Sequence, residues 1–418
     1  MRKMRDSGIE WVGAIPNHWR VSKIKQIVRW KSVKGQPDLP VLSLYRDYGV
    51  IPKDSRDDNH NVTSLDTSGY KVVEHGDLVI NKMKAWQGSL AVSEYNGIVS
   101  PAYHICKITS ENICKKYLHY LLRDASYLPE YIRLSTGLRV GQWDLSFDDF
   151  KNIPFLVPPL AEQERIAAFL DAECSEIDAV LEKTRASIEE YKKLKQAVIT
   201  QAVTKGIRGN RPMKDSGIEW IGEIPAEWGV VPHKRIMHKV KEICEQYNGE
   251  DVISLTVNGV VKRDLTAGGK MPTSFDGYQY VEPNDLLLCL FDIDVTPRCV
   301  GVVRDYGVTS PAYSRFVMHD GYYNAYYDYL LRMIDDNKVF VHLSKNLRSS
   351  LTESDFGAIK TCAPPLAEQK CIAAFLDVRC DEIDALIAKK QQYLTEIENY
   401  KKSLIYEYVT GKKEVHPL

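Results

Sequence analysis

The chain has 418 residues, of which 44% are hydrophobic and 27% charged, and its formal net charge at pH 7 is −1. This length predicts about two or three domains, and the balanced charge argues against indiscriminate binding of nucleic acid. No apolar run approaches the ~18 to 20 residues of a membrane span and no signal-like stretch opens the chain, so we expect a cytoplasmic protein.

The first landmark is a six-residue motif at Asp6 to Trp11 (DSGIEW), which returns at Asp215 to Trp220. A second motif, PPLAEQ, stands at 158–163 and again at 364–369. The offsets are 209 and 206 residues, so nearly the whole chain is one unit duplicated in tandem. We expect a first globular domain over residues 1–157 and a second over 209–363.

The first globular domain combines short strand-like runs with one helix-like segment. The runs Pro40 to Leu44, Asp77 to Ile80 and Ile98 to Ile105 predict strands, and Asn112 to Arg123 predicts a helix. The domain carries 22 Lys/Arg against 17 Asp/Glu, a net of +5. Mixed α/β is therefore the expected class.

Two loops of this domain carry cations, an aromatic ring and amides, the groups that contact phosphates and base edges. For the first loop, a solvated hairpin tip is an equally good interpretation. For the second, the arginine could instead pair with a local carboxylate such as Asp144. The candidate DNA-binding residues are Lys82, Lys84, Trp86, Gln87, Arg139 and Gln142.

Residues 158–208 follow a heptad pattern that predicts a central coiled-coil helix. Pro159 suits the first turn, where no backbone donor is lost, and Gly206 is a usual helix stop. The proposed apolar seam includes Leu170, Ile177, Leu181 and Ile188.

The second globular domain repeats the scaffold with different loops. Its strand-like runs are Asp251 to Leu255, Asp285 to Leu290 and Val308 to Val317, and Asn324 to Met333 predicts a helix. It carries 17 Lys/Arg against 21 Asp/Glu, a net of −4, so DNA binding here requires cations gathered on one face. The candidate DNA-binding residues are Thr296, Arg298, Lys345, Asn346 and Arg348.

Residues 364–412 repeat the helical pattern, and 413–418 form a tail. The seam residues here are Leu376, Ile383, Ile387, Leu394 and Ile397. Both seams are buried if the second helix folds back antiparallel along the first, which carries the C-terminus towards the first domain. About 45 helical residues at ~1.5 Å each span ~65 Å, so the pair would act as a stiff spacer. The expected fold is two mixed α/β domains in a tandem pseudo-two-fold repeat, separated by two long antiparallel coiled-coil helices.

Catalytic signatures are missing from the sequence. The prolines at 158 and 364 follow Val157 and Ala363, whereas an adenine methyltransferase motif needs Asn or Asp there. No Gly-rich loop for S-adenosylmethionine or ATP is present. The nine cysteines never form Cys-x-x-Cys, which favours reduced thiols over disulfides or a metal site.

The duplicated motif PPLAEQ-x-x-IAAFLD followed by Glu-Ile-Asp, each time after a variable domain, resembles the specificity subunit (HsdS) family of type I restriction–modification systems. The resemblance implies two target-recognition domains that each read one half of an asymmetric, bipartite DNA site. It implies a coiled coil that sets the gap and docks two methyltransferase (modification) subunits, joined by restriction/translocase subunits. S-adenosylmethionine, ATP and Mg are then expected on those partners, and no cofactor, metal or catalytic residue in this chain.

Two other hypotheses stand beside this one. A coiled-coil protein–protein adaptor without nucleic-acid binding fits the near-zero net charge. A self-contained methyltransferase or nuclease would require activity of the purified chain with S-adenosylmethionine or Mg²⁺, and we expect none.

Overall fold

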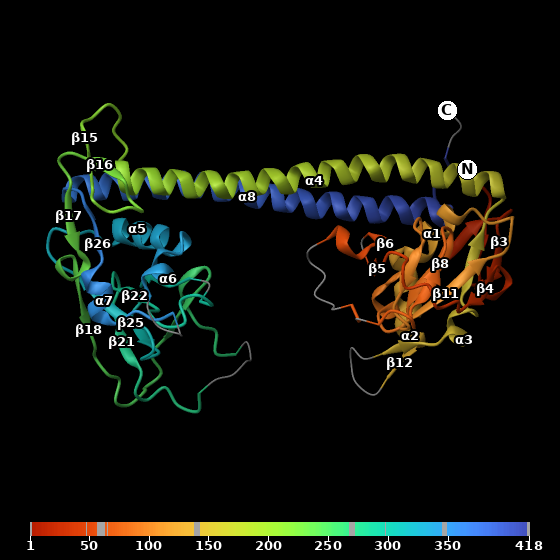
Figure 1. Cartoon of the computed structure of the whole chain (residues 1–418), viewed down its shortest axis with the longest axis horizontal. Coiled ribbons are helices and arrows are strands. Elements are labelled where there is room, and N and C mark those ends of the chain that lie inside the picture. The colour runs from red at the N-terminus through yellow and green to blue at the C-terminus, as the bar shows by residue number, and fades with distance from the viewer. Residues whose placement is uncertain are drawn as a thin grey trace. The chain divides into compact units, whose positions relative to one another are not determined.

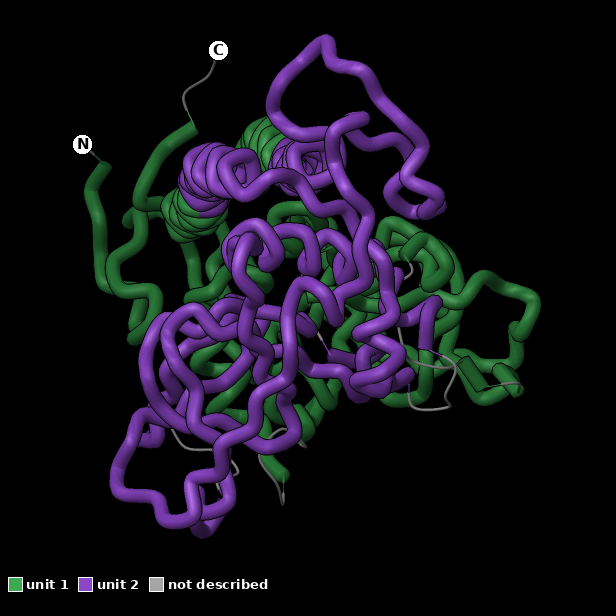
Figure 2. Tube along the Cα trace, turned by 90° about the vertical axis from the view of Figure 1, so that its left-hand side faces the viewer, with its two compact units in different colours: residues 1–185, 392–418 green, residues 186–391 purple. Residues whose placement is uncertain are grey.

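The computed structural model describes residues 2–46, 48–56, 63–64, 66–137, 143–266, 272–296, 298–344 and 349–415. The chain divides into two compact units (Figure 2): unit 1 holds residues 1–185 and 392–418, and unit 2 holds 186–391. Each unit therefore combines one globular domain with a part of each long helix, α4 (Leu160–Lys205) and α8 (Leu366–Val409) (Figure 1).

Unit 1 is built on an antiparallel sheet with the strand order β4-β11-β8-β9. Its strand β8 is buried at all five positions, as expected for a strand covered on both faces. Three short helices complete the domain: α1 (Lys115–Arg123), α2 (Leu128–Leu134) and α3 (Phe147–Phe150). The described strands are β1 (Met4–Asp6), β2 (Ala14–Pro16), β3 (Arg20–Lys23), β4 (Val28–Lys31), β5 (Leu42–Tyr45), β6 (Gly49–Pro52), β7 (Lys71–Val73), β8 (Asp77–Asn81), β9 (Leu90–Val92), β10 (Gly97–Val99), β11 (Tyr103–Ile108), β12 (Ser135–Thr136), β13 (Asp144–Leu145) and β14 (Pro154–Val157).

Unit 2 has the corresponding sheet, β18-β25-β22-β23, and a second sheet, β20-β19-β24-β21, in which β19 and β24 run parallel. Its helices are α5 (Asn324–Asp336), α6 (Val339–Leu343) and α7 (Glu353–Ala358). The described strands are β15 (Met213–Asp215), β16 (Glu223–Pro225), β17 (Gly229–Pro232), β18 (Met237–Val240), β19 (Val252–Thr256), β20 (Gly259–Lys262), β21 (Gln279–Val281), β22 (Leu286–Leu288), β23 (Val300–Val302), β24 (Gly307–Thr309), β25 (Ser314–Met318) and β26 (Lys360–Ala363). The mixed α/β class is confirmed.

One detail of the predicted strands is wrong in both units. The runs 98–105 and 308–317 were each expected as one strand, but each divides into two strands that belong to different sheets. Pro101 and Pro311 stand at the break, where a missing N–H group and a fixed φ angle favour a turn over a continuous ladder.

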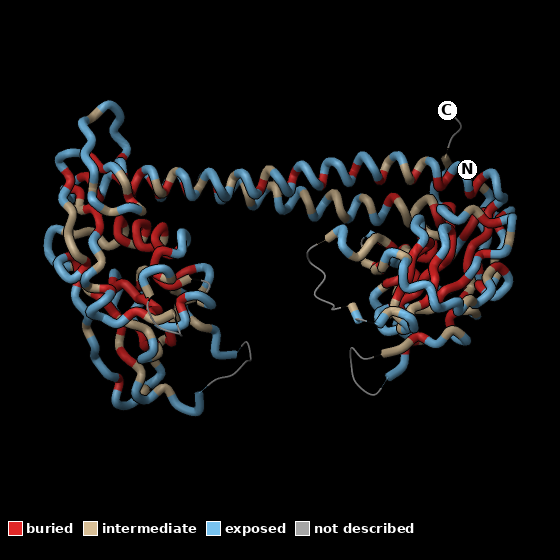
Figure 3. Tube along the Cα trace, in the orientation of Figure 1, coloured by how far each residue is buried: buried red, intermediate tan, exposed pale blue. Residues whose placement is uncertain are grey.

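The globular core of unit 1 extends onto both helices (Figure 3). Buried side chains at the start of α4, such as Ile166 and Leu170, pack in the same cluster as Leu404 and Val409 near the end of α8. The Tyr117 hydroxyl donates to the Val409 carbonyl over 3.0 Å. The C-terminal end of α8 is thus held against the first globular domain, as the antiparallel fold-back predicts.

Unit 2 repeats this junction with the helices exchanged. Here the start of α8 (Ile372, Leu376) and the end of α4 (Val203) share one core cluster. The Tyr326 hydroxyl donates to the Val203 carbonyl over 2.8 Å, the counterpart of the Tyr117 bond.

A buried glutamine fixes the first turn of each long helix. The Gln163 side-chain oxygen accepts from the Cys114 N–H, while its amide donates to the Asn112 and Pro158 carbonyls. Gln369 accepts from the Tyr323 N–H and donates to the Gly321 and Pro364 carbonyls. Both glutamines have no exposed surface, and each one binds three backbone groups, of which the proline carbonyl is buried.

Within each unit the two helix segments run antiparallel. In unit 1, Asp178 binds Lys401 at 2.6 Å and Arg185 binds Glu398 at 2.6 Å. Residue numbers along α4 increase from 178 to 185 while those of their partners on α8 decrease from 401 to 398, so the two segments are antiparallel. In unit 2, Lys195 binds Asp384 at 2.5 Å, and Lys390 lies over the ring of Tyr191. The predicted seam residues are buried at Leu170, Ile177, Leu181, Ile188, Leu376 and Ile383, and half-buried at Ile387, Leu394 and Ile397.

Candidate nucleic-acid interface

In unit 1 four predicted DNA-binding residues lie in the short connection between β8 and β9. Backbone bonds from Lys84 to the Asn81 carbonyl and from Gln87 to the Lys84 carbonyl turn the chain sharply. Gly88 ends the turn with φ of 82°, a conformation that favours glycine. This geometry leaves Lys84 and Gln87 exposed and Trp86 half-buried.

The connection contacts the residues that follow the second predicted loop of unit 1. The Leu145 N–H donates to the Lys82 carbonyl over 3.0 Å, and the Lys82 ammonium binds the Asp144 carboxylate at 2.9 Å. The rings of Trp86 and Trp143 meet edge to face with centroids 5.4 Å apart. The first predicted loop is therefore held against the residues that follow the second predicted loop. Arg139 and Gln142 lie outside the described residues.

A lysine cluster that was not predicted from the sequence lies close to this connection. The Lys71 ammonium donates to the carbonyls of Pro101 and Tyr103. Burial lowers the pKa of Lys71, and the neighbouring cations Lys34 and Lys82 lower it further. Cations that weaken one another's protonation create a positive region, which favours phosphate groups. The sequence of β7, which begins at Lys71, gave no sign that this lysine belongs to a cluster of cations.

A half-buried histidine supports the same surface. One ring nitrogen of His104 lies 3.2 Å from the Leu145 carbonyl. Burial lowers the pKa of His104, which favours the neutral ring at neutral pH. His104 thus serves to hold β13 and does not add to the positive charge.

Unit 2 joins the matched segments through the same backbone bond. The Leu351 N–H donates to the Leu290 carbonyl over 2.8 Å, the counterpart of the Leu145 bond in unit 1. A second bond joins the Ile293 N–H to the Ser349 carbonyl. Lys345, Asn346 and Arg348, which precede Ser349, lie outside the described residues.

The predicted residues Thr296 and Arg298 of unit 2 are occupied by local contacts. The Thr296 hydroxyl donates to the Asp292 carbonyl. The Arg298 side chain is 18% exposed, donates to the Val300 carbonyl and lies 3.9 Å from Asp328. Burial lowers the pKa of Arg298. Its guanidinium is therefore directed into the domain, whereas Phe291 and Val295 of the same loop are exposed.

The charge of the two surfaces differs at a matched position. Where unit 1 has Lys71, unit 2 has Gln279, whose amide donates to the carbonyls of Ser310 and Tyr313. The matched carbonyls of Tyr103 and Tyr313 are thus bound by a cation in unit 1 and by a neutral amide in unit 2. This exchange accounts locally for part of the charge difference seen in the sequence.

Across the described ranges, no group of three or more His, Cys, Asp or Glu is placed to hold a metal ion. Nor does any helix in that part of the chain have the length and apolar character needed to cross a membrane. The candidate site in the described part of each unit is therefore a loop surface on the globular domain.

Comparison with known proteins gives a consistent result. Residues 16–190 match the family model of the type I restriction modification DNA specificity domain. Two relatives from Methanocaldococcus jannaschii are each 24% identical over 97% of this chain. One of them is the type I restriction enzyme MjaVIII specificity subunit, of which 95% is covered.

Two solved structures share the fold. A chain from a structure of a type I R-M system has a TM-score of 0.70 at 14% identity, covering 96% of this chain and 99% of that chain. The HsdS subunit from Thermoanaerobacter tengcongensis has a TM-score of 0.50 at 14% identity, covering 98% of this chain and 100% of that chain. The resemblance to the specificity subunit family, first drawn from the repeated motifs, is confirmed.

Proposed function

We propose that this chain, which carries a type I restriction modification DNA specificity domain in residues 16–190, is the non-catalytic specificity subunit of a type I restriction–modification enzyme. Each globular domain reads one half of a bipartite, asymmetric DNA site. The two helices set the gap between the halves and dock two methyltransferase subunits, to which restriction/translocase subunits bind. S-adenosylmethionine, ATP and Mg²⁺ act on those partners.

One observation carries the proposal. Equivalent backbone bonds, Leu145 to Lys82 and Leu351 to Leu290, join the loop that follows β8 or β22 to the segment that precedes α3 or α7. The loops themselves have different sequences, NKMKAWQG in unit 1 and FDIDVTPR in unit 2. One scaffold that presents two different loop surfaces suits two domains that read different sequences.

The helix geometry supports the role of a spacer. Each long helix begins in the core of one unit and ends in the core of the other, as the Tyr117–Val409 and Tyr326–Val203 bonds show. Because a helix adds ~1.5 Å per residue, helix length bears directly on the distance between the half-sites. Deleting one heptad from both helices, around Ile188 and Leu394, should change the gap and leave the half-sites unchanged. An unchanged gap would refute the spacer role.

The first test is genome-wide mapping of adenine methylation. The chain is expressed with its neighbouring methyltransferase subunit in a host without methylation. We expect a split motif with a fixed gap that disappears when this chain is omitted. Methylation that persists without the chain, or no methylation at all, would instead favour the adaptor function or an inactive system.

A further inference from the structure

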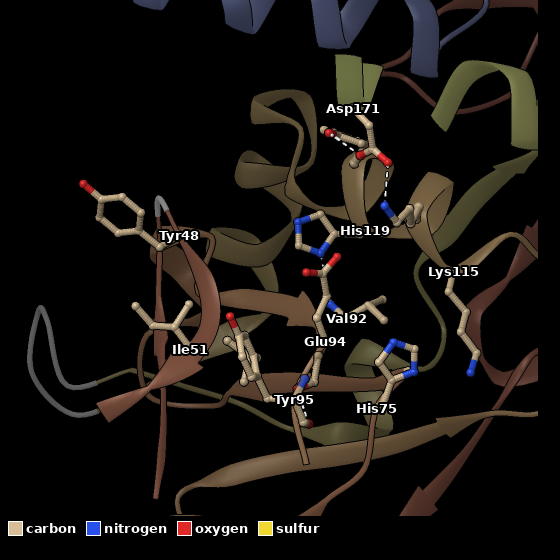
Figure 4. A pocket seen from close by; sticks show the side chains of 14 residues that line it. Tyr48, Ile51, His75, Val92, Glu94, Tyr95, Lys115, His119 and Asp171 are labelled. Atoms are coloured by element: carbon tan, nitrogen blue, oxygen red, sulfur yellow. Dashed lines mark hydrogen bonds and ion pairs between the residues drawn. The ribbon is translucent and has the colours of Figure 1, made fainter. Parts of the chain in front are cut away.

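Unit 1 contains a cavity of about 370 Å³ on a side of the domain that the proposed DNA loops do not line. Its walls come from β6, the turn before β8, the end of β9 and α1, and Asp171 of α4 adds to them (Figure 4). Cavities of this size hold small organic ligands in many proteins. The chemistry of its walls indicates which class of ligand fits.

The cavity holds a cation that is available to a ligand. Lys115 is the first residue of α1, and no described residue forms a hydrogen bond or an ion pair with its ammonium group. Its side chain passes over Gly76, where an added Cβ would lie 2.1 Å from the Lys115 nitrogen. Gly76 has a φ of +88°, which by itself favours glycine, and the Lys115 side chain occupies the open space beside it. The neighbouring Lys116, in contrast, is bound to Asp171 at 2.6 Å.

The cavity also holds a hydrogen-bond donor of fixed orientation. Nδ1 of His119 lies 3.3 Å from the Val92 N–H, which can only donate, so this nitrogen carries no proton. Burial lowers the pKa of His119 to about 3, and the ring is therefore neutral at neutral pH. The single ring proton must then reside on Nε2, which has no acceptor among the described residues.

Aromatic rings and an acceptor complete the lining. Tyr48 and Tyr95 are both exposed large side chains at the cavity, and the Tyr120 hydroxyl is held by Asp171 at 2.9 Å. Glu94 supplies a carboxylate without a hydrogen bond to any described residue. Flat rings beside a cation favour a planar ligand that carries a negative charge.

In the matched region of unit 2, the charged side chains lie close to one another and balance their charges. There Asp328 stands in the place of His119, and Asn324 in the place of Lys115. Arg298 reaches over Gly259, the counterpart of Gly49, with a nitrogen 3.3 Å from an added Cβ, and lies 3.9 Å from Asp328. The groups that face the cavity are therefore a property of unit 1 and do not follow from the shared scaffold.

We propose that this cavity binds a small phosphorylated ligand with a flat heterocycle, of the size and chemistry of a mononucleotide. The phosphate lies at Lys115, the His119 Nε2–H donates to an acceptor on the ring, and Tyr95 lies beside the ring. This site is separate from the proposed DNA-reading loops and does not depend on them.

Isothermal titration calorimetry of the full chain with adenosine 5′-monophosphate tests the site. We expect one ligand per chain, with adenosine and inorganic phosphate each binding more weakly than the nucleotide that combines them. Lys115→Asn, which installs the residue that unit 2 itself uses at the start of α5, should weaken binding by about tenfold or more. Lys107→Gln, an exposed lysine of the same unit away from the cavity, should leave it within about twofold.

Circular dichroism of each variant confirms that the chain remains folded. A 5′-phosphorylated single DNA strand that displaces the nucleotide would identify a strand end, and not a free nucleotide, as the natural source of these groups. No saturable binding of the nucleotide, or binding that Lys115→Asn leaves unchanged, would overturn the proposal.

Discussion

Units 1 and 2 are most alike where they join the long helices and least alike in the loops that face solvent. Gln163 and Gln369 make the same three backbone hydrogen bonds. At another matched position, Lys71 and Gln279 bind the equivalent carbonyls of Tyr103 and Tyr313 with different charges. A residue that must satisfy buried backbone groups has few substitutes, whereas surface loops can change freely.

The largest expected effect follows from removing the shared glutamines. Gln163→Leu should remove three hydrogen bonds, leave the buried Pro158 carbonyl without this partner, and destabilise unit 1 by about 2 to 3 kcal/mol. Gln369→Leu should cost unit 2 a similar amount. Hydrogen exchange of α1 and α5 would report the two losses separately, with the exposed Gln87→Leu as a control. Very unequal losses would show that the two junctions are not equivalent.

The ion pairs at the junctions offer a pH test. Glu162 receives hydrogen bonds from Arg2, and its second oxygen lies 2.9 Å from the His18 ring nitrogen. Burial acts to raise the pKa of Glu162, but these partners outweigh burial and hold that pKa below its usual value. The folded state therefore binds fewer protons than the unfolded chain near the usual carboxyl pKa. The resulting stability is complete above that value and is lost as the pH falls through the lower folded-state pKa.

Glu162→Gln should thus reduce the free energy of unfolding at pH 7 by about 1 to 3 kcal/mol. The same variant should lose less stability than the unmodified chain when the pH is lowered below the usual carboxyl range. Urea titrations at neutral and acidic pH measure both effects. An equal acid-induced loss in the two proteins would exclude Glu162 as a source of the pH dependence.

Substitution of Arg298 distinguishes a structural role of this arginine in unit 2 from a role in reading DNA. Arg298→Ala removes a charged hydrogen bond to the Val300 carbonyl and a cation near the buried Asp328, whose pKa is raised by burial. We expect a loss of about 1 to 2 kcal/mol in the stability of unit 2, measured by exchange of α5 amides. Unchanged stability combined with relaxed specificity at one base would favour direct reading of DNA by this arginine.

The smallest effect is expected at the exposed lysine of unit 1. Lys84 is exposed, while Lys82 is bound to Asp144. Lys84→Ala should weaken DNA binding evenly across sequences and reduce the salt slope by about one unit if the lysine meets a phosphate. Lys82→Ala should reduce the slope less, since Asp144 already balances its charge. An equal salt dependence of DNA binding for Lys84→Ala and the unmodified complex would show that Lys84 does not contact a phosphate.

Periodicity in the sequence predicted the long helices and their antiparallel pairing within each unit. Most of the named seam residues, including Leu170 and Leu376, are fully buried, because a heptad pattern reports directly on a buried stripe. The broken strands at Pro101 and Pro311 were missed because apolar runs do not reveal which sheet a strand joins.

Candidate contacts were harder to predict than the fold. Arg298 is directed into the domain, where it lies 3.9 Å from Asp328. These two residues are 30 positions apart in the chain, and no pattern in the sequence indicates that they are close in the fold. Lys71 was missed for the same reason, since its neighbours Lys34 and Lys82 approach only in the folded domain. Charge clusters built from distant segments leave no local pattern in a sequence.

The most direct test of two independent readers is an exchange of one domain. Residues 1–157 are replaced by the corresponding domain of another specificity subunit, and the methylated motif is mapped with the same methyltransferase subunit. The account predicts that one half-site changes while the other half-site stays the same. A change in both half-sites would contradict it.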